Sequence, residues 1–315
     1  MGVISNPGSV HVNAALTNFA IGYRNGKLIA NDVCPVMKVA KESDVYYVWD
    51  RSNTYRLPVD LRADGAASND VEFGLSTSPY SAQEYALKTK ITDRQRDNAD
   101  SVLRLEQSKT RMVQDLVMTR REKRVATLLT TLNNWDSAAR TTLSGTGQWN
   151  NASFAGSIEE DIDTGKEAAR SLIGMEPNTI IIPAAVAKVM KRDATIRELI
   201  KYTQNDLLVN GDLPPTLWNM RVLIPGAVEI TSEEGAATTV TADIWGKHVT
   251  MLWLPEGREV TNEDPVACKT FRARDWMVKQ WRNEELSSTF YEPSFVEDAV
   301  LTSNISGYLI RSAIA

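Results

Sequence analysis

One long helical pattern directly follows a segment of strand and loop signals, and this pair constrains the fold most. Residues 98–134 carry apolar side chains at spacings of three and four, without glycine or proline, which predicts one amphipathic helix. At 1.5 Å per residue this helix is about 55 Å long. Residues 44–87 alternate aromatic and arginine side chains with little aliphatic material. Neither segment is typical of a self-contained globule, so together they predict a subunit that reaches across its neighbours in an ordered assembly.

The segment before the helix predicts a long two-stranded projection. Residues 45–49 are strongly β-forming, and residues 84–92 alternate polar and apolar side chains as a returning strand does. The residues between them are rich in Asp, Asn, Ser, Gly and Pro, which mark turns and loops. Because an isolated hairpin is marginally stable in water, this projection needs a surface to lie on.

The middle of the predicted helix, residues 119–124, is polar on every side. Two alternatives remain, a solvated midsection or a contact with the acidic surface of a partner, and the solvated midsection is preferred.

The rest of the chain mixes helices and strands without strict alternation, which predicts an α+β fold. Helical patterns occupy residues 157–173, 184–190 and 196–202, and a fully buried strand is predicted between Pro177 and Pro183. The last fifty residues alternate strongly and predict the strands of a sheet.

Composition excludes several classes of protein. The 315 residues carry a net charge of −5, whereas proteins that grip nucleic acid tightly have a positive excess. No apolar run approaches the about 20 residues of a membrane span, and the start has no signal-peptide pattern. Cys34 and Cys268 are expected to be buried free thiols, because two distant cysteines form neither a disulfide framework nor a zinc motif.

The sequence offers little for catalysis. Its two histidines, His11 and His248, have no nearby partners, and no phosphate-binding loop or nucleophile elbow occurs. The acidic cluster at residues 159–163 is best explained as the first turn of a helix, where the helix dipole favours negative charge. We therefore expect no enzyme activity, no cofactor and no metal site; a hydrolase that uses dispersed carboxylates is the alternative of another class.

The order of the parts resembles the major capsid proteins of tailed bacteriophages, whose HK97-like shell fold is shared with encapsulins. A polar N-terminal arm, a β projection, an unbroken long helix and a strand-rich tail ending in SGYLIRSAIA follow one another. The most specific part is residues 177–202, PNTIIIPAAVAKVMKRDATIRELIKY, in which strand, proline and helix succeed each other.

The resemblance implies a division of the chain: an N-terminal arm and first strand (1–44), an extended β loop that lies on the adjacent subunit (45–92), a peripheral domain with the long spine helix (93–140 and 266–315) and an axial domain (141–265). Some relatives cross-link their shells through a lysine of the extended loop. This chain has no lysine between Lys41 and Lys88, which argues against such a cross-link.

The resemblance also implies a structural function. Copies are expected to form hexameric and pentameric capsomers of a virion shell that encloses double-stranded DNA without sequence-specific binding, assembled in the cytoplasm of a bacterial host. Scaffolding, portal and decoration proteins are possible partners, and an encapsulin-like cargo shell is the alternative. No membrane partner is expected. The candidate assembly residues are the aromatic and basic side chains of the loop and of the helix midsection: Trp49, Arg51, Tyr55, Arg56, Arg62, Tyr80, Arg120, Arg121 and Arg124.

Overall fold

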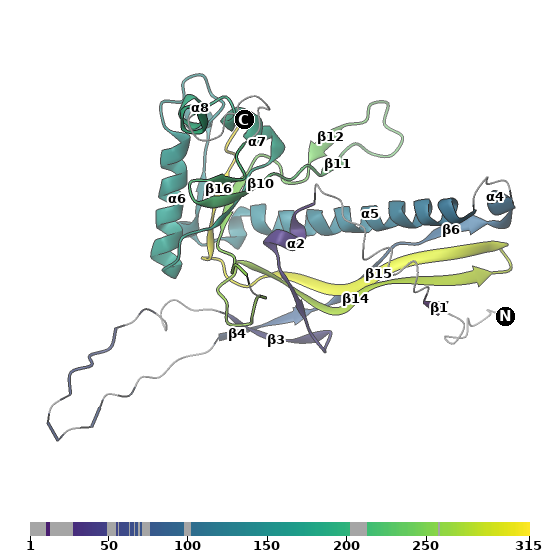
Figure 1. Ribbon diagram of the computed structural model, residues 1–315, viewed down its shortest axis with the longest axis horizontal. Helices are drawn as coiled ribbons and strands as arrows, with labels where there is room; N and C mark the ends of the chain where they lie inside the picture. Colours follow the sequence, from purple (N-terminus) through teal and green to yellow (C-terminus); the bar gives the residue numbers. More distant parts are fainter. Residues whose placement is uncertain are drawn as a thin grey trace.

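The protein is an elongated α+β subunit in which a long helix lies along a long β-hairpin, with a cluster of helices and short strands at one end (Figure 1). This computed structural model describes residues 11–12, 28–48, 55, 57–62, 64–65, 67–68, 70, 76–97, 102–201, 213–257 and 259–315. Within these ranges, no helix is both long enough and apolar enough to span a bilayer.

The first sheet is built around the long antiparallel hairpin. Its strands β14 (Cys268–Asn283) and β15 (Ser288–Leu301) pair along almost their whole length. Four short strands flank the hairpin: β5 (Gln83–Ala86) and β6 (Thr89–Thr92) beside β15, and β1 (His11–Val12) and the parallel β2 (Val36–Lys38) beside β14.

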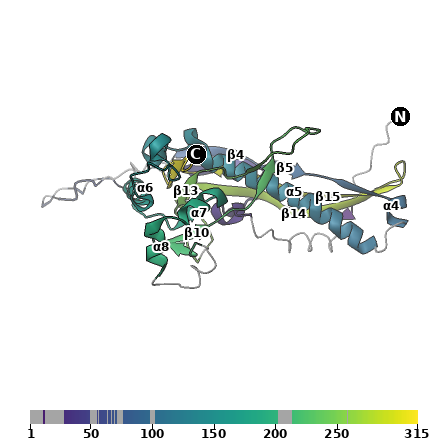
Figure 2. The same cartoon turned by 90° about the horizontal axis from the view of Figure 1, so that it is seen from above.

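The prediction of a two-stranded projection that returns at Thr92 is wrong in its second half. β3 (Ser43–Val48) pairs with β4 (Ser76–Ser81), whereas β5 and β6 pair with β15. The apolar side of β6 explains the difference, because Ile91 is completely buried against Val278 and Tyr291 of the hairpin. Between β3 and β4, the described residues 55, 57–62, 64–65, 67–68 and 70 project from the body (Figures 1 and 2), so the projection is shorter than predicted.

The predicted long helix is present with different ends. α4 (Asp93–Asp97) precedes α5 (Val102–Thr130), and a 3-10 helix, η2 (Leu132–Asn134), follows it. Residues 98–101, including the predicted helix start, lie outside the described residues. α5 ends where Thr131 takes an extended backbone, with φ −76° and ψ 118°. Its apolar side packs on the first sheet and on the core through Val113, Val117, Val125, Ala126 and Leu129.

The second sheet lies at the end of the molecule that carries the helices (Figure 1). α6 (Ile158–Ile173), α7 (Ala184–Met190) and α8 (Ala194–Lys201) surround it. A separate hairpin of β11 (Val228–Ile230) and β12 (Thr241–Asp243) reaches out over α5. The strand order of the sheet is β7 (Arg140–Thr142), β16 (Gly307–Arg311), β13 (Val249–Leu252), β8 (Thr179–Ile181), β10 (Met220–Leu223) and β9 (Thr216–Leu217).

The strand and helices predicted for residues 157–190 are confirmed. Every residue of β8 is buried at the centre of the sheet, which explains its unbroken apolar run. α6 lies so close to the sheet that a Cβ on Gly165 would be 2.2 Å from the Met251 side chain and 2.8 Å from that of Tyr308. Glycine at this position allows the helix to approach.

The last strand, β16, pairs with β13 and β7 in the second sheet, whereas β14 and β15 form the first. The C-terminal residues assigned to the peripheral domain are thus shared between the two sheets. The division into arm, loop, peripheral and axial domains stays a prediction.

The prediction of free thiols is wrong, because Cys34 and Cys268 form a disulfide across 234 residues of sequence. β2 runs parallel to β14, and this pairing brings the two Cα atoms within 4.9 Å of each other. Both cysteines are fully buried. The disulfide fixes residues 29–38, which we call the strap, to the first sheet.

Candidate assembly surface

The segment between β3 and β4 exposes apolar side chains that its own subunit leaves uncovered. Leu57 is 93% exposed, Val59 69% and Leu61 83%. They alternate with Pro58 and Asp60, and this spacing places side chains on one side of an extended chain. Burying each of them fully would contribute about 1.5–3 kcal/mol. An alternating apolar row of this kind is suited to lie on another surface.

Tyr55 ties the start of this segment to the body. Its hydroxyl donates a hydrogen bond to the carbonyl of Ile173, at the last turn of α6. α6 ends at Gly174, whose φ of 69° is in the left-handed region that glycine adopts without strain. A Cβ at Gly174 would also lie 2.6 Å from the Tyr55 hydroxyl oxygen. Tyr55 thus holds this point of the segment against the end of α6.

The other candidate assembly residues of the loop fall into three groups. Trp49, Arg51 and Arg56 lie outside the described residues, and Arg62 is exposed. Tyr80 is only 5% exposed, because its ring stacks on Phe271 with centroids 4.5 Å apart. Burial also raises the pKa of the Tyr80 hydroxyl. Tyr80 is therefore a core residue, which corrects its prediction as an assembly residue.

The solvated midsection predicted for the long helix is also wrong. Arg121 and Glu122 are 1% and 0% exposed, whereas Arg120 is exposed and Arg124 is partly buried. Arg121 cannot contact a neighbouring copy from this position, so it too is removed from the assembly residues. The spacing of apolar residues is the sequence signal for this burial. Arg121 lies four residues after Val117 and four before Val125, on the buried stripe of the helix.

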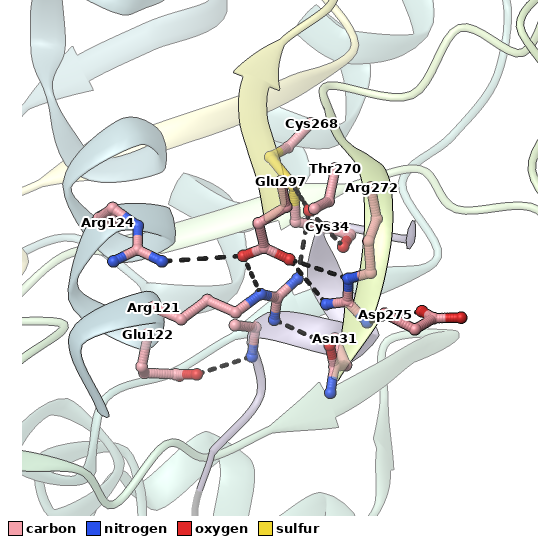
Figure 3. A network of polar contacts seen from close by, with 11 residues as sticks. Asn31, Cys34, Arg121, Glu122, Arg124, Cys268, Thr270, Arg272, Asp275 and Glu297 are labelled. Atoms are coloured by element: carbon pink, nitrogen blue, oxygen red, sulfur yellow. Dashed lines mark hydrogen bonds and ion pairs between the residues drawn. A yellow bond between two sulfur atoms is a disulfide. The ribbon is translucent and has the colours of Figure 1, made fainter. Parts of the chain in front are cut away.

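Arg121 joins a buried network centred on Glu297 of β15 (Figure 3). Its Nε donates to Glu297 Oε1 at 2.7 Å, and Arg272 Nη2 of β14 donates to the other carboxylate oxygen at 2.7 Å. The Arg121 guanidinium also donates to Asn31 Oδ1 at 2.8 Å and to Thr270 Oγ1 at 3.2 Å. Burial lowers the pKa of Arg121, and the Glu297 carboxylate opposes that shift.

Glu122 holds the strap from the next position of the helix. Its carboxylate accepts hydrogen bonds from the amide nitrogens of Ile29 at 3.1 Å and Ala30 at 2.8 Å, and from Trp245 Nε1 at 2.7 Å. Burial raises the pKa of Glu122, and these hydrogen bonds partly offset the rise. Three parts of the chain that are distant in sequence thus meet at one carboxylate.

Together, Glu122, the Glu297 network and the disulfide join α5, the strap and the long hairpin. Buried polar groups with satisfied partners specify one arrangement of the elements around them. They hold α5, the strap and the long hairpin in one arrangement. The candidates that remain for assembly among the described residues are Tyr55, Arg62, Arg120 and Arg124, and their role stays a prediction.

Comparison with known proteins agrees with this geometry. The chain is 28% identical over 305 residues to the major capsid protein of Burkholderia phage BcepMu, and the match covers 95% of both proteins. A crystal structure of a phage-related protein from Bordetella bronchiseptica RB50 superposes with a TM-score of 0.75 at 21% identity, covering 96% of this chain and 98% of that one. The capsid structure of Cyanophage P-SCSP1u gives a TM-score of 0.62 at 11% identity, covering 92% and 89%.

These structures confirm the predicted α+β, HK97-like capsid fold. The family comparison is more specific, because residues 75–265 match the phage capsid protein family. Since this match spans more than half of the 315 residues, the chain belongs to the phage capsid protein family.

Proposed function

We propose that this protein is the major capsid protein of a tailed bacteriophage, with a structural rather than a catalytic role. Hexamers and pentamers of the subunit build the virion shell around double-stranded DNA, and the shell assembles in the cytoplasm of the bacterial host. Scaffolding, portal and decoration proteins are its expected partners.

The exposed apolar row of Leu57, Val59 and Leu61 is the observation that carries this proposal. In a lone subunit these side chains contact water, so the ordering of the segment brings no compensating burial. In a shell, each copy covers the row of its neighbour and is itself covered. Many such contacts, each weak alone, make a closed assembly stable.

The proposed domains follow from the two sheets. The first sheet with α5 corresponds to the peripheral domain, and the second sheet with α6, α7 and α8 corresponds to most of the axial domain. β16 links the two, because it returns from the hairpin into the second sheet. The segment between β3 and β4 acts as the extended loop.

The charge of the chain suits a container for DNA. A net charge of −5 gives no overall attraction to phosphates, and tight nucleic-acid binding depends on neutralising many of them. The shell would hold its genome by enclosure.

Electron microscopy of the purified protein tests the proposal. We expect closed shells or capsomer rings, formed either by the protein alone or together with a scaffolding protein. A protein that stays a monodisperse monomer at all protein and salt concentrations, with and without scaffolding protein, contradicts it.

A further inference from the structure

The Cys34–Cys268 disulfide occurs in a protein whose proposed function places it in two redox compartments. Thiols stay reduced in a bacterial cytoplasm, where the shell is proposed to assemble, whereas disulfides form and persist outside cells and on virions. The bond joins the strap to the start of β14, beside the Glu297 network (Figure 3). A subunit that assembles in the cytoplasm therefore meets conditions that favour two thiols first and conditions that favour the bond afterwards.

Contacts other than the bond hold the two cysteines together. β2 and β14 begin to pair two residues after Cys34 and Cys268, at Val36 and Thr270. The amide nitrogen of Thr270 donates to the carbonyl of Pro35 at 2.9 Å. The Thr270 hydroxyl lies 3.3 Å from both the carbonyl oxygen and the sulfur of Cys34 and donates to them. Because these contacts do not need the disulfide, the dithiol form keeps the same arrangement and the bond forms without refolding.

Burial limits the chemistry that is open to this pair. Both cysteines are completely buried, in the apolar cluster that also contains Leu129 of α5 and Leu309 of β16. Other chains and bulky thiol reagents do not reach them in the folded subunit, so each cysteine has the other as its partner. The oxidant must be small and uncharged, and dissolved oxygen meets both conditions. As the S–S bond forms, both S–H bonds break, and the oxygen molecule takes up the two electrons and two protons and leaves as hydrogen peroxide.

The bond changes how firmly the strap is held. Without it, the strap is held by noncovalent contacts, among them the β2 pairing, a hydrogen bond from Ala30 to Glu122 and a partly exposed ion pair. That ion pair joins Asp32 to Arg221 of β10 at 3.8 Å and links the strap to the second sheet. Short segments held in this way open locally at a lower free energy than the core does. The disulfide keeps the strap on β14 while the surrounding hydrogen bonds open and close.

We propose that Cys34 and Cys268 form a redox latch. The pair is a dithiol in subunits that assemble in the host cytoplasm, and it becomes a disulfide in virions after release, where it holds the strap of each subunit on the first sheet. This rests on the proposed function and adds to it a covalent step that follows assembly. Since the bond lies within one chain, it secures each subunit without joining copies.

Trapping the thiols with acid tests the order of these events. Cells that express the protein are quenched with trichloroacetic acid, and shells released from the same culture are quenched after exposure to air. Both samples are denatured and treated with a polymer-linked maleimide, which shifts the chain on a gel once for each thiol. We expect two shifts for the chain inside cells and none for released shells. The control Cys34→Ala should give one shift in both samples, since Cys268 then has no partner.

Hydrogen exchange of backbone amides measures what the bond does to the strap. Wild-type shells purified without oxygen are compared with the same shells after exposure to air, so no variant is needed. The strap amides of Ile29, Ala30 and Cys34, which donate hydrogen bonds in the folded subunit, should exchange about tenfold more slowly after exposure to air. The internal control is β8, buried at the centre of the second sheet, whose amides should exchange equally in both samples.

A disulfide in the chain quenched inside cells, two thiols in released shells after exposure to air, or equal exchange of the strap amides before and after oxidation would each overturn the latch and leave the proposed function intact. A wild-type protein that forms no shells contradicts the proposed function itself.

Discussion

Glu297 lies between two arginine side chains in a part of the subunit that excludes water. Its side chain is 1% exposed, as is that of Arg121, and that of Arg272 is 11% exposed. Removing one member of a buried ion pair leaves an uncompensated charge, which costs about 3–5 kcal/mol. The network fixes how α5 and the long hairpin are arranged rather than adding net stability, since an apolar cluster of the same volume could be equally stable.

Glu297→Gln should therefore lower the free energy of unfolding of the unassembled subunit by about 3–5 kcal/mol, measured by urea unfolding with tryptophan fluorescence. The matched control is Glu292→Gln on the same strand, which loses only a partly exposed pair with Lys279 and should cost below about 1 kcal/mol. Equal losses of unfolding free energy from the two substitutions would show that the buried network contributes no more to stability than the partly exposed pair does.

The raised pKa of Glu122 predicts how the stability of the subunit changes with pH. Its pKa in the folded subunit is raised above the ordinary value of 4.5, so the folded state takes up the proton before the unfolded state does. Stability that depends on this group is present below the ordinary pKa and is lost as the pH rises through the raised pKa.

We expect the stability of the wild type relative to Glu122→Gln to increase as the pH falls through this window. Paired urea titrations at several pH values measure the difference in unfolding free energy between the wild type and Glu122→Gln. Taking this difference cancels the contributions of the other titrating groups, which the two proteins share. A difference that stays constant, or that shrinks toward low pH, contradicts the assigned environment of Glu122.

Part of this arrangement of residues can be predicted from the sequence. The spacing of Val117, Arg121 and Val125 places all three on one stripe of α5. It does not reveal which acid meets Arg121, because Glu297 is 176 residues away and reaches it only through the fold. For the same reason, the sequence assigned Tyr80 to the surface, although Phe271 covers it.

Among the elements, the strap is held by contacts with parts of the chain that are distant in sequence. It contains the short helix α2 (Ala30–Val33) and β2, and the disulfide, Glu122 and the ladder to β14 hold it in place. A disulfide that closes so long a loop restricts the unfolded chain strongly.

Cys34→Ala/Cys268→Ala should lower the free energy of unfolding by about 2–4 kcal/mol. Reduction of the wild type before unfolding should bring its stability close to that of the variant. Peptide mapping without reductant identifies the bond itself. If reductant leaves wild-type stability unchanged and the map shows two free thiols, the cross-link is absent from the native protein.

Elements with a strong local pattern were predictable, and their partners were not. The apolar run of β8 and the period of α6 and α7 follow from neighbouring residues, so their positions agree with the structure. Residues 84–92 were correctly predicted to be extended, and they form β5 and β6, but the strand with which they pair lies about two hundred positions away. Their assignment to the projection instead of to β15 was wrong for this reason.

At the scale of the whole molecule, the order of the elements carried more information than any motif. A strand-rich loop followed by a long helix predicted a subunit that reaches beyond itself, and membership in the phage capsid protein family agrees with it. A groove of about 880 Å³ between α5, β5 and β15 was not predictable, because these elements form it only after folding. Its lining nevertheless includes Arg120 and Arg124 of the predicted assembly residues.

The central claim is that copies of this subunit build a shell by covering the apolar row of their neighbours. Its most direct test is sedimentation velocity, with electron microscopy of the fractions, on the Leu57→Ser/Val59→Ser/Leu61→Ser variant. Ala67→Ser, exposed in the same segment, is the control. We predict a variant with an unchanged unfolding midpoint that sediments as unassembled subunits, while the wild type and the control form shells. Normal shells from the triple variant would contradict the claim.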